Sequence, residues 1–267
     1  MTASDFVPFA YSNEVANGKI TWKSPSNIAL VKYWGKKENQ IPANPSISFT
    51  LDTCATTTTI AYRKLEEEGN EFSFDLLFEG KPKDSFRPKI MTFFKRIEKY
   101  LPFLKSYHFT IETSNSFPHS SGIASSASGM SALSLCLMSL EKELYPEMSA
   151  EYFNRKASFL ARLGSGSACR SIEGNLMEWG LHGETDGSSN EYAIKYPYTI
   201  HKVFTNYQDT ILLVDKGQKQ VSSTVGHELM HGHPFAEQRF LQAHNNLTKL
   251  QLVFANGNLN EFIEIVE

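Results

Sequence analysis

The chain has 267 residues, which is long enough for two ordinary domains with a large core. Its composition, 41% hydrophobic and 21% charged, is that of a globular protein, and its net charge of -3 offers no basic surface to nucleic acid. The three cysteines show neither paired nor metal-binding spacing, and no signal peptide or membrane-spanning stretch is evident. We therefore expect a cytoplasmic protein that binds neither nucleic acid nor a membrane.

The first half of the chain predicts four strands and one helix. Strands are expected at residues 20–32, 56–63, 71–78 and 108–113, where β-branched residues gather or apolar and polar residues alternate. Between the last two, apolar residues at helical spacing predict a helix over residues 88–101, which a proline ends. This mixed order of strands and helices is typical of an α+β fold.

Three more helices are predicted in the second half of the chain. A mostly apolar helix follows a serine-rich loop and runs to about Leu144. The next is capped by Ser149 and closes at Gly164, and the last runs from Pro234 to about Phe254.

Shorter strands are expected between and around these helices, at residues 174–179, 191–196 and 210–215. A change of composition over residues 183–208 suggests a domain boundary. The last residues, FIEIVE, read as a helix without a cap, so we expect the natural chain to continue beyond Glu267.

The serine-rich loop, NSFPHSSGIASSASGMS at residues 115–131, lies between a predicted strand and a predicted helix. Free N–H groups at a helix N-terminus favour a phosphate, and glycines such as Gly122 let the backbone approach it closely. Ser125, Ser126 and Ser128 can donate to phosphate oxygens, and either Ser125 or Ser126 could hold Mg²⁺. The loop has no Walker A pattern. Phosphate binding and a serine-rich helix cap both fit these residues.

Two further segments gather groups that could bind anions. In SPSNIALVKYWGKK, residues 24–37, Lys32 and Lys36 follow an apolar strand, where they could meet an anion or simply extend into water. In GSGSACRS, residues 164–171, Arg170 can grip a carboxylate or phosphate with two parallel hydrogen bonds. Cys169 beside it reads as a packing residue, because no base is evident that would activate its thiol.

Together, NIALVKYWGK, FPHSSGIASSASG and GSGSACRS resemble the diphosphomevalonate decarboxylases of the GHMP kinase superfamily, with VSSTVG at residues 221–226 as a weaker match. The resemblance implies the α+β GHMP kinase two-domain fold. Residues 1–195 would form an N-terminal domain like ribosomal protein S5 domain 2, and residues 196–267 would begin a ferredoxin-like C-terminal domain.

The activity implied by the resemblance is a decarboxylation in the mevalonate route to isoprenoids. ATP and Mg²⁺ would serve to phosphorylate the tertiary hydroxyl of (R)-5-diphosphomevalonate. Phosphate and CO₂ would then leave, giving isopentenyl diphosphate. The family commonly forms homodimers, which makes a homodimer the expectation here.

The resemblance also assigns roles to residues of the matching motifs. The implied substrate-binding residues are Lys32, Tyr33, Trp34, Gly35, Lys36, Arg87, Ser165, Gly166, Ser167, Ala168, Cys169 and Arg170. The implied ATP-binding residues are Asn115, Pro118, Ser120, Ser121, Gly122, Ala124, Ser125, Ser126 and Ser128. Arg87 comes from a loose match, and Arg170 is the expected catalytic residue that orients the carboxylate lost as CO₂.

Some features depart from the family pattern. The family's catalytic aspartate lies in a late motif of the type DAGxN, which these 267 residues lack, so we expect this chain alone to be inactive. His227 stands where the family usually has methionine, and His233 takes the place of a threonine. Both changes lie near the expected substrate pocket.

Three alternatives therefore remain beside the decarboxylase. One is a related GHMP kinase or decarboxylase that acts on mevalonate or its monophosphate. Another is a binding protein that keeps the fold without catalysis. The last is a zinc hydrolase, because HELMH in HELMHGH, residues 227–233, fits the bare HExxH pattern. The glycine and proline that follow would break the helix that a zinc site of this type needs.

Overall fold

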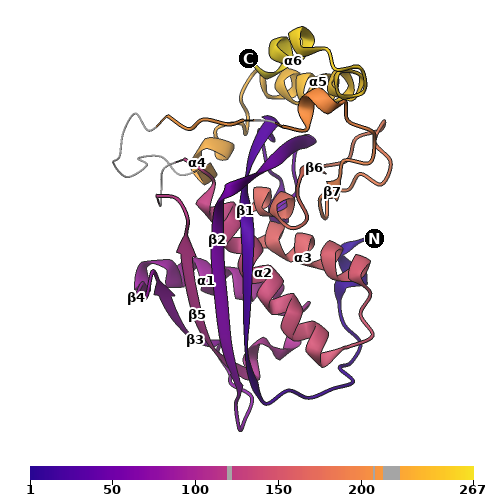
Figure 1. The fold of residues 1–267 in the computed structure, drawn as a ribbon. Coiled ribbons are helices and arrows are strands. Elements are labelled where there is room, and N and C mark those ends of the chain that lie inside the picture. The colour runs from indigo at the N-terminus through magenta and orange to yellow at the C-terminus, as the bar shows by residue number, and fades with distance from the viewer. Residues whose placement is uncertain (119–121, 207, 213–222) are drawn as a thin grey trace.

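The computed structural model describes residues 1–118, 122–206, 208–212 and 223–267. Within these residues one mixed sheet has helices packed on one face, and two more helices lie at one end of it (Figure 1). The strands are β1 Asn17–Val31, β2 Ser46–Lys64, β3 Ser73–Phe78, β4 Lys81–Pro82, β5 Tyr107–Asn115, β6 Leu176–Trp179 and β7 Ile194–Lys195. The helices are α1 Arg87–Ile97, α2 Ser125–Leu144, α3 Ala150–Gly164, α4 Ser223–Glu228, α5 Ala236–Asn256 and α6 Leu259–Val266, with a 3-10 turn η5 at Gly166–Ser171.

Strand β2 organises the sheet. It pairs along its length with β1, and on its other side it pairs first with β6 and then with β5, all antiparallel. Strand β3 continues the sheet beyond β5 in a parallel pairing. Because β2 spans 19 residues, it reaches from one end of the sheet to the other (Figure 1).

Most of the expected elements are present, with two exceptions. The strand expected at residues 191–196 shrinks to the two residues of β7. The strand expected at residues 210–215 is wrong for residues 210–212, which form no regular structure and pair with no described strand, and its remainder lies outside the described residues.

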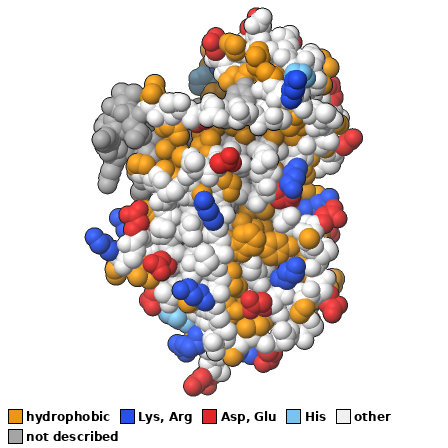
Figure 2. Space-filling view, in the orientation of Figure 1, with side chains coloured by type: hydrophobic (Ala, Val, Ile, Leu, Met, Phe, Trp, Pro, Cys, Tyr) orange, Lys and Arg blue, Asp and Glu red, His pale blue; other side chains and the backbone are white. Residues whose placement is uncertain are grey.

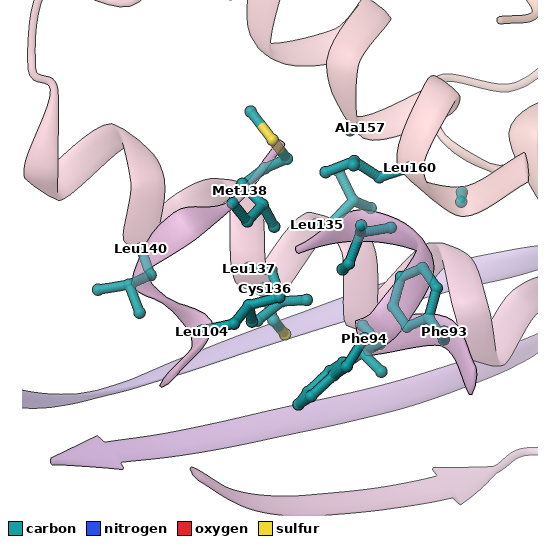
Figure 3. Packing of buried hydrophobic residues seen from close by; sticks show 14 of the residues in the cluster. Phe93, Phe94, Leu104, Leu135, Cys136, Leu137, Met138, Leu140, Ala157 and Leu160 are labelled. Carbon is teal, nitrogen blue, oxygen red and sulfur yellow. The ribbon is translucent and has the colours of Figure 1, made fainter. Parts of the chain in front are cut away.

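The main core lies between the sheet and helices α1, α2 and α3. Figure 3 shows Phe93 and Phe94 of α1 facing Leu135 and Cys136 of α2, with Leu160 of α3 beside them. Helix α2 is buried on nearly all sides through its middle, which explains why it carries apolar and small residues, serines among them, and no charge before Glu141.

A second hydrophobic cluster fixes α5 and α6 to the end of the sheet. Leu247 and Leu250 of α5 pack with Val31 of β1 and Ile47 of β2, and all four side chains are buried. The two long strands therefore contribute to both clusters. At this end of the molecule apolar side chains also reach the surface (Figure 2). Leu252 of α5 and Ile263 of α6 are exposed apolar residues of these two helices.

Strand β1 forms an edge of the sheet, since among the described strands it pairs only with β2. The pairing register shifts between Pro25 and Asn27, where the missing N–H of proline would interrupt a ladder. Lys19 and Lys23 are exposed on the same strand. Proline, a bulge and lysines are features that natural edge strands use to prevent pairing with another chain.

Candidate active site

A cavity of about 810 Å³ lies where the three predicted motifs meet. From the predicted residues it is lined by Lys32, Tyr33, Trp34, Lys36, Gly122, Ala124, Ser126, Ser165, Gly166, Ser167 and Arg170. The strand end, the serine-rich loop and η5 are far apart in sequence, so the fold is what gathers them around one space.

The segment after β1 forms one wall, and Asn44 fixes its backbone. The Trp34 N–H donates to Asn44 Oδ1 at 2.9 Å, and Asn44 Nδ2 donates to the Lys32 carbonyl at 3.0 Å. Gly35 does not line the cavity; a Cβ there would come within 2.9 Å of Phe240 Cζ on α5. The glycine thus allows α5 to pack directly behind this wall.

Arg170 forms the floor of the cavity and is only 2% exposed. Its guanidinium donates to Ser46 Oγ and, at 3.4 Å, to Asn27 Oδ1, and it lies over the Tyr33 ring. Within the described structure its Nε–H has no hydrogen-bond partner. Burial lowers the pKa of Arg170, and burial raises the pKa of Tyr33 to about 12. A buried cation with an unused donor favours an anionic ligand.

Helix α2 begins at the opposite wall. Before it, Gly122 and Ala124 take positive φ angles of 87° and 53°, which turn the chain sharply into the helix. Ser126 Oγ receives a hydrogen bond from Lys89 Nζ at 2.5 Å and donates to Ser165 Oγ at 3.3 Å. Lys89 is exposed to solvent in part, and desolvation by the protein atoms around its ammonium group lowers its pKa.

A second pocket of about 220 Å³ adjoins the same helix end. Its rim carries Asn115, Ser125 and Ser126, three of the predicted nucleotide residues, together with Lys89. The rest of its lining is mostly apolar, with Leu76, Phe78, Phe86, Ile90, Ile111, Met130 and Leu133 beside Gly129 and the threonines Thr56, Thr58 and Thr113.

Other predicted residues lie away from both spaces. The Arg87 guanidinium donates to the Phe74 carbonyl at 2.8 Å and stacks on the Phe74 ring, so it is held against β3. Ala168 and Cys169 are fully buried, and Ser128 Oγ bonds Thr56 Oγ1 at 2.6 Å. Pro118 lies outside the lining of both spaces, and Ser120 and Ser121 lie outside the described residues.

Among the lining residues of the large cavity that were not predicted as site residues, four have polar side chains, namely Asn27, Gln40, Lys89 and His227. His227 had been placed only near the pocket. A signal for Lys89 was present, because it follows Arg87 by two residues in a cationic stretch at a helix start.

The chemistry of the lining is basic. Among the described lining residues of the two spaces there are four cations, Lys32, Lys36, Lys89 and Arg170, and no carboxylate. Among the described residues, no three His, Cys, Asp or Glu side chains are grouped so that they could hold a metal ion. Helix α4 ends at Glu228, so His227 and His231 do not share one continuous helix as HExxH requires.

We also find no apolar span in the described helices that could cross a bilayer.

Solved structures show the same fold. The chain matches mevalonate diphosphate decarboxylase from Staphylococcus aureus with a TM-score of 0.74 at 24% identity, covering 94% of this chain and 71% of that one. It matches MDDEF in complex with MVAPP, AMPPCP and magnesium with a TM-score of 0.70 at 26% identity, covering 94% of this chain and 72% of that one. The expected α+β fold of the GHMP kinase type is therefore confirmed.

Sequence comparisons show to which protein family the chain belongs. Residues 24–191 match the family described as Diphosphomevalonate decarboxylase-like N-terminal domain, and the chain belongs to this family. Diphosphomevalonate decarboxylase ERG19 from Gibberella zeae is 32% identical over 217 residues, which cover 76% of this chain and 53% of the relative. The chain spans about half the length of the curated relatives it matches.

Proposed function

We propose that this chain carries the substrate and ATP sites of a diphosphomevalonate decarboxylase, an ATP-dependent carboxy-lyase of the mevalonate route to isoprenoids. The reaction phosphorylates the tertiary hydroxyl of (R)-5-diphosphomevalonate, after which phosphate and CO₂ leave and isopentenyl diphosphate forms. The family membership and the names of the relatives support this activity.

One observation of the structure supports it most, namely a cavity lined by four cations and no described carboxylate. A substrate with a diphosphate and a carboxylate needs several such donors. Lys32 and Lys36 on the β1 side suit the diphosphate, as point charges on flexible stems. Arg170, with its fixed fork and unused Nε–H, suits the carboxylate that is lost.

The residues around the start of α2 fit a nucleotide triphosphate. The helix offers free N–H groups, Ser125 and Ser126 offer hydroxyls, and Lys89 offers a cation, while the apolar pocket beside them suits a base. A related structure contains AMPPCP and magnesium. When bound, ATP and Mg²⁺ supply the phosphoryl group and neutralise its charge, and Ser125 or Ser126 would be the hydroxyl ligand of Mg²⁺.

A second candidate function is favoured by a different observation. Among the described lining residues no carboxylate stands ready to accept the proton of the substrate hydroxyl. A GHMP-fold protein that binds these ligands without turning them over agrees with that lining. A related enzyme that acts on mevalonate or its monophosphate differs only in the number of phosphates bound.

The deciding experiment is CO₂ release from carboxyl-labelled diphosphomevalonate with ATP and Mg²⁺, by the natural gene product that contains these residues. The monophosphate is assayed in parallel. ATP-dependent CO₂ from the diphosphate supports the decarboxylase. ADP without CO₂ identifies a kinase relative, and binding of both ligands without either product identifies a non-catalytic protein.

We also propose a cytoplasmic homodimer. The three cysteines are free, and two of them are buried, which agrees with a reducing compartment. The homodimer rests on the resemblance alone. Light scattering at several protein concentrations tests it, and a constant monomer mass would contradict it.

A further inference from the structure

His227 connects a late segment of the chain to the wall that follows β1. It is 8% exposed and lines the large cavity together with Gly226. Its ring stacks on the Tyr33 ring, with centroids 4.3 Å apart and planes inclined by 22°. Its Nδ1 lies 2.8 Å from the Trp34 carbonyl oxygen, so Nδ1 carries the proton and donates.

The two contacts act on consecutive residues of the same wall. Tyr33 in turn meets Trp179 edge-on at 5.0 Å, and the Arg170 guanidinium lies 5.9 Å from the Tyr33 ring. The ring of Tyr33 is thus in contact with His227, with Trp179 and with the Arg170 guanidinium. Lys32 and Lys36 flank this pair of aromatic residues in the sequence, so their backbone depends on the same anchoring.

We propose that His227 is a positioning residue, which fixes Tyr33 and Trp34 so that Lys32 and Lys36 are held ready for an anionic ligand. Each contact does part of this task. The stacking sets the plane of the Tyr33 ring, and the Nδ1 hydrogen bond sets the orientation of the Trp34 peptide. This inference rests on the proposed function, because it takes the cavity to be the diphosphate site.

Two substitutions separate the contacts. His227→Phe keeps a ring over Tyr33 and removes the donor, whereas His227→Asn keeps an N–H near the position of Nδ1 and removes the ring. Inorganic diphosphate is the probe, and its Kd is measured by calorimetry. We expect each variant to bind it roughly threefold to tenfold more weakly, because each loses one contact of ordinary strength.

Three controls distinguish positioning from a general loss of structure. His231→Asn makes the same chemical change at an exposed residue of the same segment and leaves the Kd unchanged. Binding of AMPPCP, which uses the α2 loop, stays within twofold of wild type in the His227 variants. Their Tm remains well above the temperature of the binding measurement.

A second readout needs no ligand. In a Trp22→Phe background, Trp34 is the partly exposed tryptophan, since Trp179 is fully buried. Acrylamide quenches Trp34 more strongly in the His227→Ala variant if His227 holds the wall. Unchanged quenching together with a diphosphate Kd within twofold of wild type overturns the proposal. If the wild type binds no diphosphate, the proposed function of the cavity fails, and the quenching still decides whether His227 positions the wall.

Discussion

Lys89 and Ser126 line both spaces of the candidate site, and Lys89 is the charged one of the two. It lines the large cavity and the smaller apolar pocket, and its Nζ donates to Ser126 Oγ at the start of α2. A cation between two binding spaces can neutralise charge that passes from one ligand to the other. Its position therefore suits the phosphoryl group that the proposed reaction transfers.

We expect Lys89→Met to weaken binding of AMPPCP by about tenfold, because one charge-assisted contact to phosphate is lost. Calorimetry with AMPPCP and Mg²⁺ measures the change. Lys95→Met, an exposed lysine on the same helix, is the control and should bind like wild type. Equal affinity in the Lys89 variant would show that this lysine does not contact the nucleotide.

The three predicted motifs border one cavity, whereas single side chains that complete its lining were not predicted; the roles of these residues stay predictions. The three loops meet in one cavity, because each begins or ends a long element. Arg87 and Lys89 show the limit. They lie two residues apart on α1, which turns one to the Phe74 carbonyl and the other to Ser126. Only the packing of α1 against the sheet decides which cation faces the cavity.

At the scale of elements, the cap of α3 follows from local chemistry alone. The sequence predicted Ser149 as its N-cap, and its Oγ accepts from the Tyr152 N–H at 3.1 Å. We expect Ser149→Ala to lower the free energy of unfolding by about 1 kcal/mol, because a helix N–H loses its acceptor. Urea unfolding with an unchanged m value measures this, and Ser114→Ala, an exposed serine on β5, should cost less than half as much. An equal loss in both would contradict the capping role.

The contact of Gly35 with α5 gives a second prediction at this scale. Gly35→Ala would place a methyl group 2.9 Å from Phe240 Cζ and 3.2 Å from Ala43 Cβ. We expect it to cost roughly 1–2 kcal/mol of stability, as overpacking does. In a Phe240→Ala background the same substitution should cost much less, because the ring tip is gone. Additive effects in this double-mutant cycle would show that the wall and α5 are not in contact.

Elements that depend on distant partners were harder to predict. Strand β2 begins at Ser46, ten residues before its predicted start. The earlier part was missed because Ser46 and Ser48 are buried polar residues, which break the expected alternation of apolar and polar residues. Ser46 Oγ bonds the Trp179 carbonyl across the sheet, a contact that no local pattern announces. The two-residue β7 exists only because β6 lies beside it.

At the scale of the whole molecule, a buried polar network joins the sheet to α5. Glu178 of β6 is 1% exposed; its Oε2 accepts from Thr185 Oγ1 at 3.2 Å, and Thr185 Oγ1 accepts from Gln251 of α5 at 2.8 Å. His182 completes the network, with Nε2 3.2 Å from Thr248 Oγ1 on α5. Burial raises the pKa of Glu178 to about 7 and lowers that of His182.

This network makes stability depend on pH. The folded pKa of Glu178 lies above the unfolded value of about 4.3, so the fold favours the protonated acid. That contribution is complete below about pH 4.3 and is lost as the pH rises to about 7. We expect Glu178→Gln to reduce the change in the free energy of unfolding between pH 4.5 and 8 by roughly 1–3 kcal/mol. We also expect this substitution to raise the Tm at pH 8. Thermal unfolding from pH 4.5 to 8 measures it.

The matched control is Glu237→Gln, which changes an exposed carboxylate at the start of α5 and should leave the profile parallel to that of wild type. Parallel profiles for wild type and Glu178→Gln would show that Glu178 is ionised throughout this range.

The same network bears on the domain division at residue 195, which stays a prediction. Leu247 of α5 packs on Val31 and Ile47, so the later segment shares its core with β1 and β2.

The edge position of β1 has a consequence for how copies of the protein behave when crowded together. Strand β1 has fifteen residues, and one side of it pairs with no described strand, which makes it a long template for a foreign strand. Pro25 and the exposed lysines, Lys19 and Lys23, are features that prevent a strand of another chain from pairing with β1. Exchanging all three for valine would leave the cavity untouched and yet turn a clear concentrated solution turbid, as sheets of neighbouring molecules join edge to edge.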